Sequence, residues 1–194
     1  MSSKNEIRLA LHELGSLSER LRDEIIWIMR VEFEPIVRDA GMVLRIIPAI
    51  HSRGDLNIDF DSKSPPGKVC RTVLGEDGTG EVWVRAHREM RVCGNANPLT
   101  GKRDRRRLLT YTALLGRALA NCAIHELGHF IADLYHTSQT QNYMQTWGPP
   151  VNKRTLRTQR EFWGGHQSFN AEQRQRLVTQ LKKREWSGDP ISFH

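Results

Sequence analysis

The sequence has little that would place the protein in a membrane or in a disulfide-linked scaffold. Its 194 residues include three cysteines, Cys70, Cys93 and Cys122, with no CxxC pair. So few cysteines exclude a dense disulfide framework and a zinc knuckle, and they leave open a single Cys70–Cys93 bridge. No run reaches the roughly 18 apolar residues of a membrane-spanning helix, and the first residues, MSSKNEIRLALHEL, lack the apolar core of a secretory signal. We therefore expect a cytosolic protein outside the membrane, with secretion after processing left open.

The length and charge predict one basic domain. A chain of this size suits a single hydrophobic core, so 1–194 is taken as one domain, with a flexible N-terminal segment over 1–16 and a loop over 148–169. The formal charge of +7 indicates affinity for an acidic partner, and nucleic acid is one option. The two basic runs, 102–107 and 153–160, are more typical of solvated surface.

The hydrophobic pattern predicts an α+β fold with its chemistry late in the chain. The expected elements are a helix over 17–40 that Pro35 kinks or divides and Gly41 ends, strands over 42–50, 56–61 and 80–90, a buried helix over 108–136, and a last helix over 171–186 capped by Asn170. The paired prolines within 64–68 predict a loop. A single α+β domain accommodates this order.

The sequence HELGH at 125–129 lies within the buried helix and is the most informative motif. Residues four apart share one face of an α-helix, so His125 and His129 can bind a single ion. Glu126 points aside and can reach a water at the metal without being a ligand. Burying these three polar groups in an apolar helix without a shared partner would be costly. The motif therefore predicts a metal-assisted hydrolase with Zn²⁺ as its cofactor.

A catalytic zinc site usually has three protein ligands and leaves one position for water. His136 lies seven residues after His129, and in a continuing helix it would be about 10 Å further along the axis. The helix must therefore end near Ala132 or Asp133 if His136 is the third ligand. Tyr135 or Asp133 are alternatives, and His166 is a more distant one.

The segment HELGHFIADLYHTSQTQNYM at 125–144 resembles the active-site block of the metzincin clan of zinc peptidases, HExxHxxGxxH followed by a methionine turn. It departs from that pattern at Ala132, where the family has glycine, and by one extra residue before His136. The resemblance implies an N-terminal helix, a twisted mixed sheet, a buried active-site helix, a turn with Met144 beneath the metal and a C-terminal helix. It also implies a zinc endopeptidase with protein or peptide substrates, in which Glu126 is the catalytic base.

The same resemblance indicates where substrate would bind. The strand that begins near residue 80 corresponds in position to the metzincin edge strand that pairs with an extended substrate, which makes Val82, Trp83 and Val84 candidate contacts. Trp147, in the loop after Met144, is in place to line a specificity pocket. An ordinary sheet strand would show the same alternation.

Three rival hypotheses stay open. A DNA-associated metalloprotease of the SprT-like kind would use His166 as a distant third ligand, and the positive charge suits it. A regulatory peptidase similar to the ImmA/IrrE group would use a carboxylate such as Glu161. A non-catalytic zinc-binding interaction protein would keep the ligands for stability alone, although the intact Glu126 argues against it.

Overall fold

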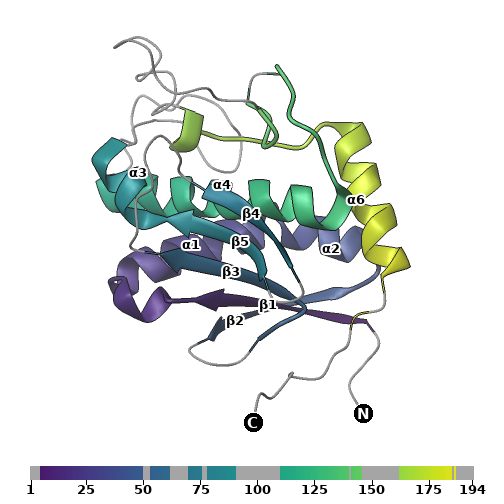
Figure 1. Cartoon of the computed structure of the whole chain (residues 1–194), viewed down its shortest axis with the longest axis horizontal. Coiled ribbons are helices and arrows are strands. Elements are labelled where there is room, and N and C mark those ends of the chain that lie inside the picture. The colour runs from purple at the N-terminus through teal and green to yellow at the C-terminus, as the bar shows by residue number, and fades with distance from the viewer. Residues whose placement is uncertain are drawn as a thin grey trace.

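The computed structural model describes residues 5–49, 53–61, 70–75, 78–90, 110–139, 141–145, 162–184 and 186. They form one sheet with helices α1, α2 and α4 on one of its faces (Figure 1). This arrangement confirms the expected α+β class. The strands are β1 (Glu6–His12), β2 (Val43–Ala49), β3 (Leu56–Asp61), β4 (Cys70–Gly75) and β5 (Gly78–Trp83). The helical elements are η1 (Leu14–Ser16), α1 (Glu19–Glu32), α2 (Glu34–Asp39), α3 (Val84–Met90), α4 (Tyr111–Ala132) and α6 (Ala171–Lys183).

The sheet is mixed and has the strand order β2-β1-β3-β5-β4. The first four of these strands are parallel to their neighbours, whereas β4 is antiparallel to β5 and forms an edge. Strands connected through helices, such as β1 and β2 through α1 and α2, can pair in parallel because the helices cover the crossover. The edge strand β4 pairs on one side only within the described sheet.

The N-terminal segment is an interior strand, which corrects the expectation of a flexible segment over 1–16. Strand β1 pairs with β2 on one side and with β3 on the other. Its residues Ile7, Leu9 and Leu11 are fully buried and alternate along the strand toward the helices. The alternation was readable from the sequence, but Glu6, Arg8 and His12 made the segment look polar.

The first long helical region is divided as predicted. Helix α1 ends at Glu32, and α2 begins at Glu34 with Pro35 in its first turn, where a missing backbone N–H costs nothing. Gly41 follows α2 with φ at +78°, a left-handed conformation that glycine adopts without strain. The predicted strands over 42–50 and 56–61 are confirmed as β2 and β3.

The strand predicted over 80–90 is only half correct. Strand β5 ends at Trp83, and the chain continues directly into α3. The helical turn brings the ring of His87 back to the Trp83 carbonyl, with Nδ1 3.0 Å from the oxygen. Since this ring is completely buried against α4, tertiary packing decides the conformation of this segment over its alternating pattern.

Helix α4 is the central element and confirms the predicted buried helix. Every residue from Leu114 to Gly128 is buried, because α1 covers one side of the helix and β4 and β5 cover another. Its first turn is capped by Thr110, whose side-chain oxygen accepts a hydrogen bond from the Ala113 N–H. The helix ends at Ala132, within one residue of the position expected from the third-ligand argument.

Helix α6 confirms the final predicted helix. Asn170 and Gln173 form a reciprocal capping box, and Leu177, Val178 and Leu181 supply the buried stripe. No helix in the described part of the chain is long and apolar enough to cross a membrane. Cys70 is a free thiol, while Cys93, the loop at 64–68 and both basic runs lie outside the described residues.

Candidate metal centre

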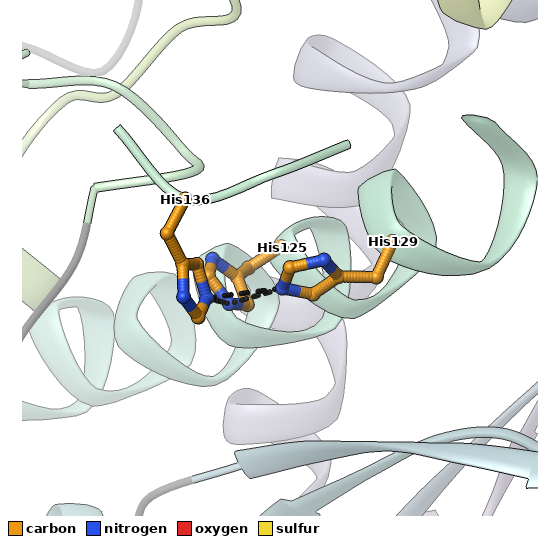
Figure 2. Close-up of side chains that lie close together, drawn as sticks. All are labelled: His125, His129 and His136. Atoms are coloured by element: carbon orange, nitrogen blue, oxygen red, sulfur yellow. Dashed lines mark hydrogen bonds between the residues drawn. The ribbon is translucent and has the colours of Figure 1, made fainter. Parts of the chain in front are cut away.

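Three histidine side chains converge at the C-terminal end of α4. The Nε2 atom of His129 lies 3.1 Å from Nε2 of His125 and 3.1 Å from Nε2 of His136, and the third pair of Nε2 atoms is 3.3 Å apart. His125 and His129 project from successive turns of α4, while His136 reaches them from the segment that follows the helix (Figure 2). Among the described His, Cys, Asp and Glu side chains, these three form the group that could share a metal ion.

Backbone carbonyls fix the orientation of the two helical rings. Nδ1 of His125 lies 2.6 Å from the Tyr143 carbonyl oxygen, and Nδ1 of His129 lies 2.6 Å from the Leu134 carbonyl oxygen. A carbonyl can only accept, so each Nδ1 carries the proton and donates it. Each Nε2 is therefore left with a lone pair, and both lone pairs point into the cluster.

This donor set fits a zinc ion. Lone pairs about 3 Å apart repel one another unless a cation lies between them. Nitrogen ligands 2.0–2.1 Å from a tetrahedral zinc ion lie about 3.3–3.4 Å apart, close to the spacing of the three Nε2 atoms. Three imidazoles that leave a fourth position open are a common ligand set of catalytic zinc.

The protonation states also suit metal binding. Burial lowers the pKa of His125 from 6.5 to about 3; its hydrogen bond to the Tyr143 carbonyl opposes the fall, and the other two histidines add to it. Burial, followed by the neighbouring His136, likewise lowers the pKa of His129. Both rings are therefore neutral at pH 7, the form in which imidazole binds metals.

A left-handed residue turns the chain back and delivers His136. Asp133 ends α4 with φ at +48° and ψ at +47°, and its backbone N–H binds the His129 carbonyl at 2.8 Å. A left-handed residue at this position is a common helix ending. The metzincin pattern has its glycine one residue earlier, at Ala132, so the extra residue here moves the turn to Asp133. The turn thus accounts for both departures from that pattern.

The other proposed third ligands lie elsewhere. Asp133 is exposed at the turn, and the side chain of Tyr135 is 74% exposed. His166 lies on the far side of α4, with its Nδ1 3.7 Å from Oε1 of Glu32. Glu161 lies outside the described residues. The structure therefore brings His136, and none of these described alternatives, to His125 and His129.

Glu126 lies beside the histidines without joining them. Its Oε1 atom is 3.9 Å from Nε2 of His125, and the residue is 2% exposed. Helix α4 approaches strand β5 very closely at this residue, because a Cβ atom added to Gly80 would lie 2.6 Å from the Glu126 Cβ. The absence of a side chain at Gly80 therefore makes room for the Glu126 side chain.

Met144 lies in a tight turn that packs under α4. A Cβ atom added to Gly128 would lie 2.8 Å from the Met144 sulfur, so the thioether rests on the helix beside His129. The Met144 N–H donates to Oδ1 of Asn142, and the Met144 carbonyl accepts from the Thr137 N–H, both at 2.8 Å. The turn also holds the Tyr143 carbonyl at His125. Met144 and its turn thus support the site, as the sequence predicted.

The predicted substrate contacts need correction. Val82, Trp83 and Val84 are between 0 and 5% exposed, and β5 lies between β3 and β4. The edge of the sheet on this side is β4, which the sequence reading did not identify because its segment follows a proline-containing stretch. Buried side chains of an interior strand cannot line an open substrate groove. Trp147 lies outside the described residues.

A second polar cluster lies one helical turn before Glu126, and the sequence reading missed it. The Cys122 sulfur is 3.2 Å from Nε2 of His87, and the thiols of Cys122 and Cys70 are hydrogen-bonded. The thiol of Cys70 is also hydrogen-bonded to Glu126. These residues come from α3, β4 and α4, so no local motif could have joined them.

A scan against protein-family models finds no match, and a search of the curated proteins finds none. The chemistry of this site is therefore the ground for assigning a function. The three imidazoles can hold a divalent cation, and the neighbouring carboxylate can accept a proton. The Tyr143 and Leu134 carbonyls and Gly80, which shape the site, gave no recognisable signal in the sequence.

Proposed function

We propose that this protein is a zinc-dependent endopeptidase in which His125, His129 and His136 hold the metal and Glu126 is the general base. The observation that carries the proposal is the mutual approach of the three Nε2 atoms within 3.1–3.3 Å, with hydrogen bonds that direct two of the lone pairs inward. The substrates we propose are proteins or peptides. Nucleic acid is not required as a partner.

The residues of the chain divide the work between them. When bound, zinc would acidify a water molecule and polarise the scissile carbonyl. The Glu126 carboxylate takes a proton from the attacking water and then gives it to the leaving amine. The close packing of Glu126 against Gly80 keeps the carboxylate in one place during both transfers.

The order of elements adds support to a metzincin-like architecture. A helix, a mixed sheet, a buried helix with the histidines, a methionine turn and a last helix follow one another as that resemblance implies. The position of His166 beside Glu32 argues against the SprT-like arrangement. The presence of Glu126 next to His125 argues against a purely structural zinc site, because stability alone does not require a proton acceptor there.

Glu126→Gln separates catalysis from metal binding. The amide keeps the size of the side chain but cannot accept the proton, so kcat/KM for a cleaved peptide should fall at least about 100-fold. Zinc content, measured by atomic emission, should stay at one ion per chain. The matched control is Glu172→Gln, which changes an exposed glutamate in the first turn of α6 and should cleave as the wild type does.

Two results would contradict the proposal. Equal cleavage rates for the wild type and Glu126→Gln would remove Glu126 from the mechanism. A wild-type protein that binds one zinc ion per chain but cleaves no member of a diverse peptide library would support the non-catalytic alternative.

A further inference from the structure

Two thiols and an imidazole form a buried chain of contacts that peptide hydrolysis does not use. Cys122, in α4, lies with its sulfur 3.2 Å from Nε2 of His87 in α3. Cys70, in the edge strand β4, is hydrogen-bonded to Cys122. Both cysteines are free thiols. The two sulfurs are thus already in contact across the packing of β4 on α4.

The arrangement activates the buried sulfur. Nδ1 of His87 donates to the Trp83 carbonyl at 3.0 Å, so Nε2 is the atom that can take a proton from Cys122. Burial alone would raise the pKa of Cys122, but the hydrogen bond from Cys70 and the adjacent His87 outweigh it and lower the pKa. Burial, Cys122 and Glu126 all raise the pKa of Cys70. The negative charge therefore resides on Cys122, while Cys70 keeps its proton.

The two sulfurs differ in access. Cys122 and His87 are completely buried, whereas Cys70 is half-buried in the edge strand. A small oxidant can therefore reach Cys70 first, and the activated thiolate waits behind it. A partly accessible thiol beside a second, low-pKa thiol is the usual arrangement of reversible oxidation sites.

We propose that Cys70 and Cys122 form an oxidation site at which a peroxide converts the two thiols into a disulfide between β4 and α4. The Cys70 proton passes to Cys122, and the Cys70 sulfur attacks the peroxide, breaking the O–O bond to give a sulfenic acid and hydroxide. With His87 taking the proton, the Cys122 sulfur then attacks Cys70 and displaces a second hydroxide. Protonation of both hydroxides gives two waters, so the thiols lose two electrons and the peroxide gains them.

The disulfide also changes the surroundings of the catalytic base, a consequence that rests on the proposed function. The Cys70 thiol is a hydrogen-bond partner of Glu126, and a disulfide sulfur has no proton to donate. Glu126 would lose this hydrogen bond, and the new covalent link would hold α4 one helical turn away. We therefore infer that oxidation inhibits peptide cleavage and that a dithiol reductant restores it.

The test uses the full zinc-loaded chain, hydrogen peroxide, and peptide mapping by mass spectrometry under non-reducing conditions. We expect a linked Cys70–Cys122 peptide, the loss of two thiols per chain, and reversal by dithiothreitol. Cys93→Ser is the matched control and should form the same linked peptide. His87→Gln, once circular dichroism shows that it is folded, should form the disulfide about tenfold more slowly, because less Cys122 is deprotonated.

Particular outcomes would overturn the proposal. A Cys70–Cys93 link, oxidation of Cys70 to sulfinic acid with Cys122 untouched, or an unchanged rate in His87→Gln would each do so. The mapping does not depend on catalysis, so its failure is distinct from failure of the peptidase proposal. If the disulfide forms and cleavage by the oxidised enzyme is unchanged, the link to Glu126 is wrong.

Discussion

Replacing Gly80 by alanine tests whether the sheet holds Glu126 in its working position. The new Cβ would lie 2.6 Å from the Glu126 Cβ and 3.1 Å from its Cγ, whereas ordinary contacts begin at 3.4 Å. Glu126 would therefore have to move by roughly 0.8 Å, and overpacking of this kind destabilises a protein by about 1–3 kcal/mol. A displacement of about 1 Å at a catalytic group can lower the rate about 100-fold. We expect Gly80→Ala to lose about that factor in kcat and to keep its zinc.

The control for this variant is the same substitution at Gly41. Nothing lies within 4 Å of a Cβ added there, but φ at +78° makes alanine cost about 1 kcal/mol. Gly41→Ala should therefore lower the free energy of unfolding, measured with urea, and leave kcat unchanged. If Gly80→Ala cleaves peptides as fast as Gly41→Ala, contact with the sheet does not position Glu126.

Two further predictions concern the metal and pH. His136→Ala should weaken zinc binding more than about 100-fold in chelator competition, since loss of an outer-shell partner alone costs 10–100-fold; the neighbouring Tyr135→Phe should bind as the wild type does, and an unaffected His136→Ala would remove this ligand. Burial raises the pKa of Glu32 from 4.5 to about 7, against the hydrogen bond with Tyr143 and the charge of Arg117. The folded protein therefore holds this proton more tightly than the unfolded chain, and its stability should fall by up to about 3 kcal/mol as the pH rises from 4.5 through 7. Urea unfolding at pH 5 and pH 8 should show a smaller difference in Glu32→Gln, and an unchanged difference would contradict the assignment.

The sequence predicted best where local rules decide the structure. Pro35 can be placed only near the start of a helix, Asn170 is a good helix cap, and the spacing of His125 and His129 fixes their common face. The requirement for a third ligand correctly placed the end of α4 near Ala132, because a continuing helix would have carried His136 away. These inferences depend on chain geometry within a few residues.

The failures concern segments whose structure depends on distant partners. The residues of β1 form a strand because β2 and β3 flank them, and α3 forms a helix because His87 packs on Cys122. The order of strands, which makes β4 and not β5 the edge, depends on pairing between segments far apart in the chain. The contact of Gly80 with Glu126 across 46 residues of sequence is of the same kind. Residue patterns do not encode such pairings locally.

The unequal burial of the three histidines has a consequence for how the site is completed. His125 is anchored in the protein interior, His129 is half-buried, and His136 is exposed on the turn after Asp133. Folding alone builds the first two positions, while an arriving ion would act as a clasp that fastens the turn to the helix. The supply of metal, and not the completion of folding, would then determine when the protein becomes competent.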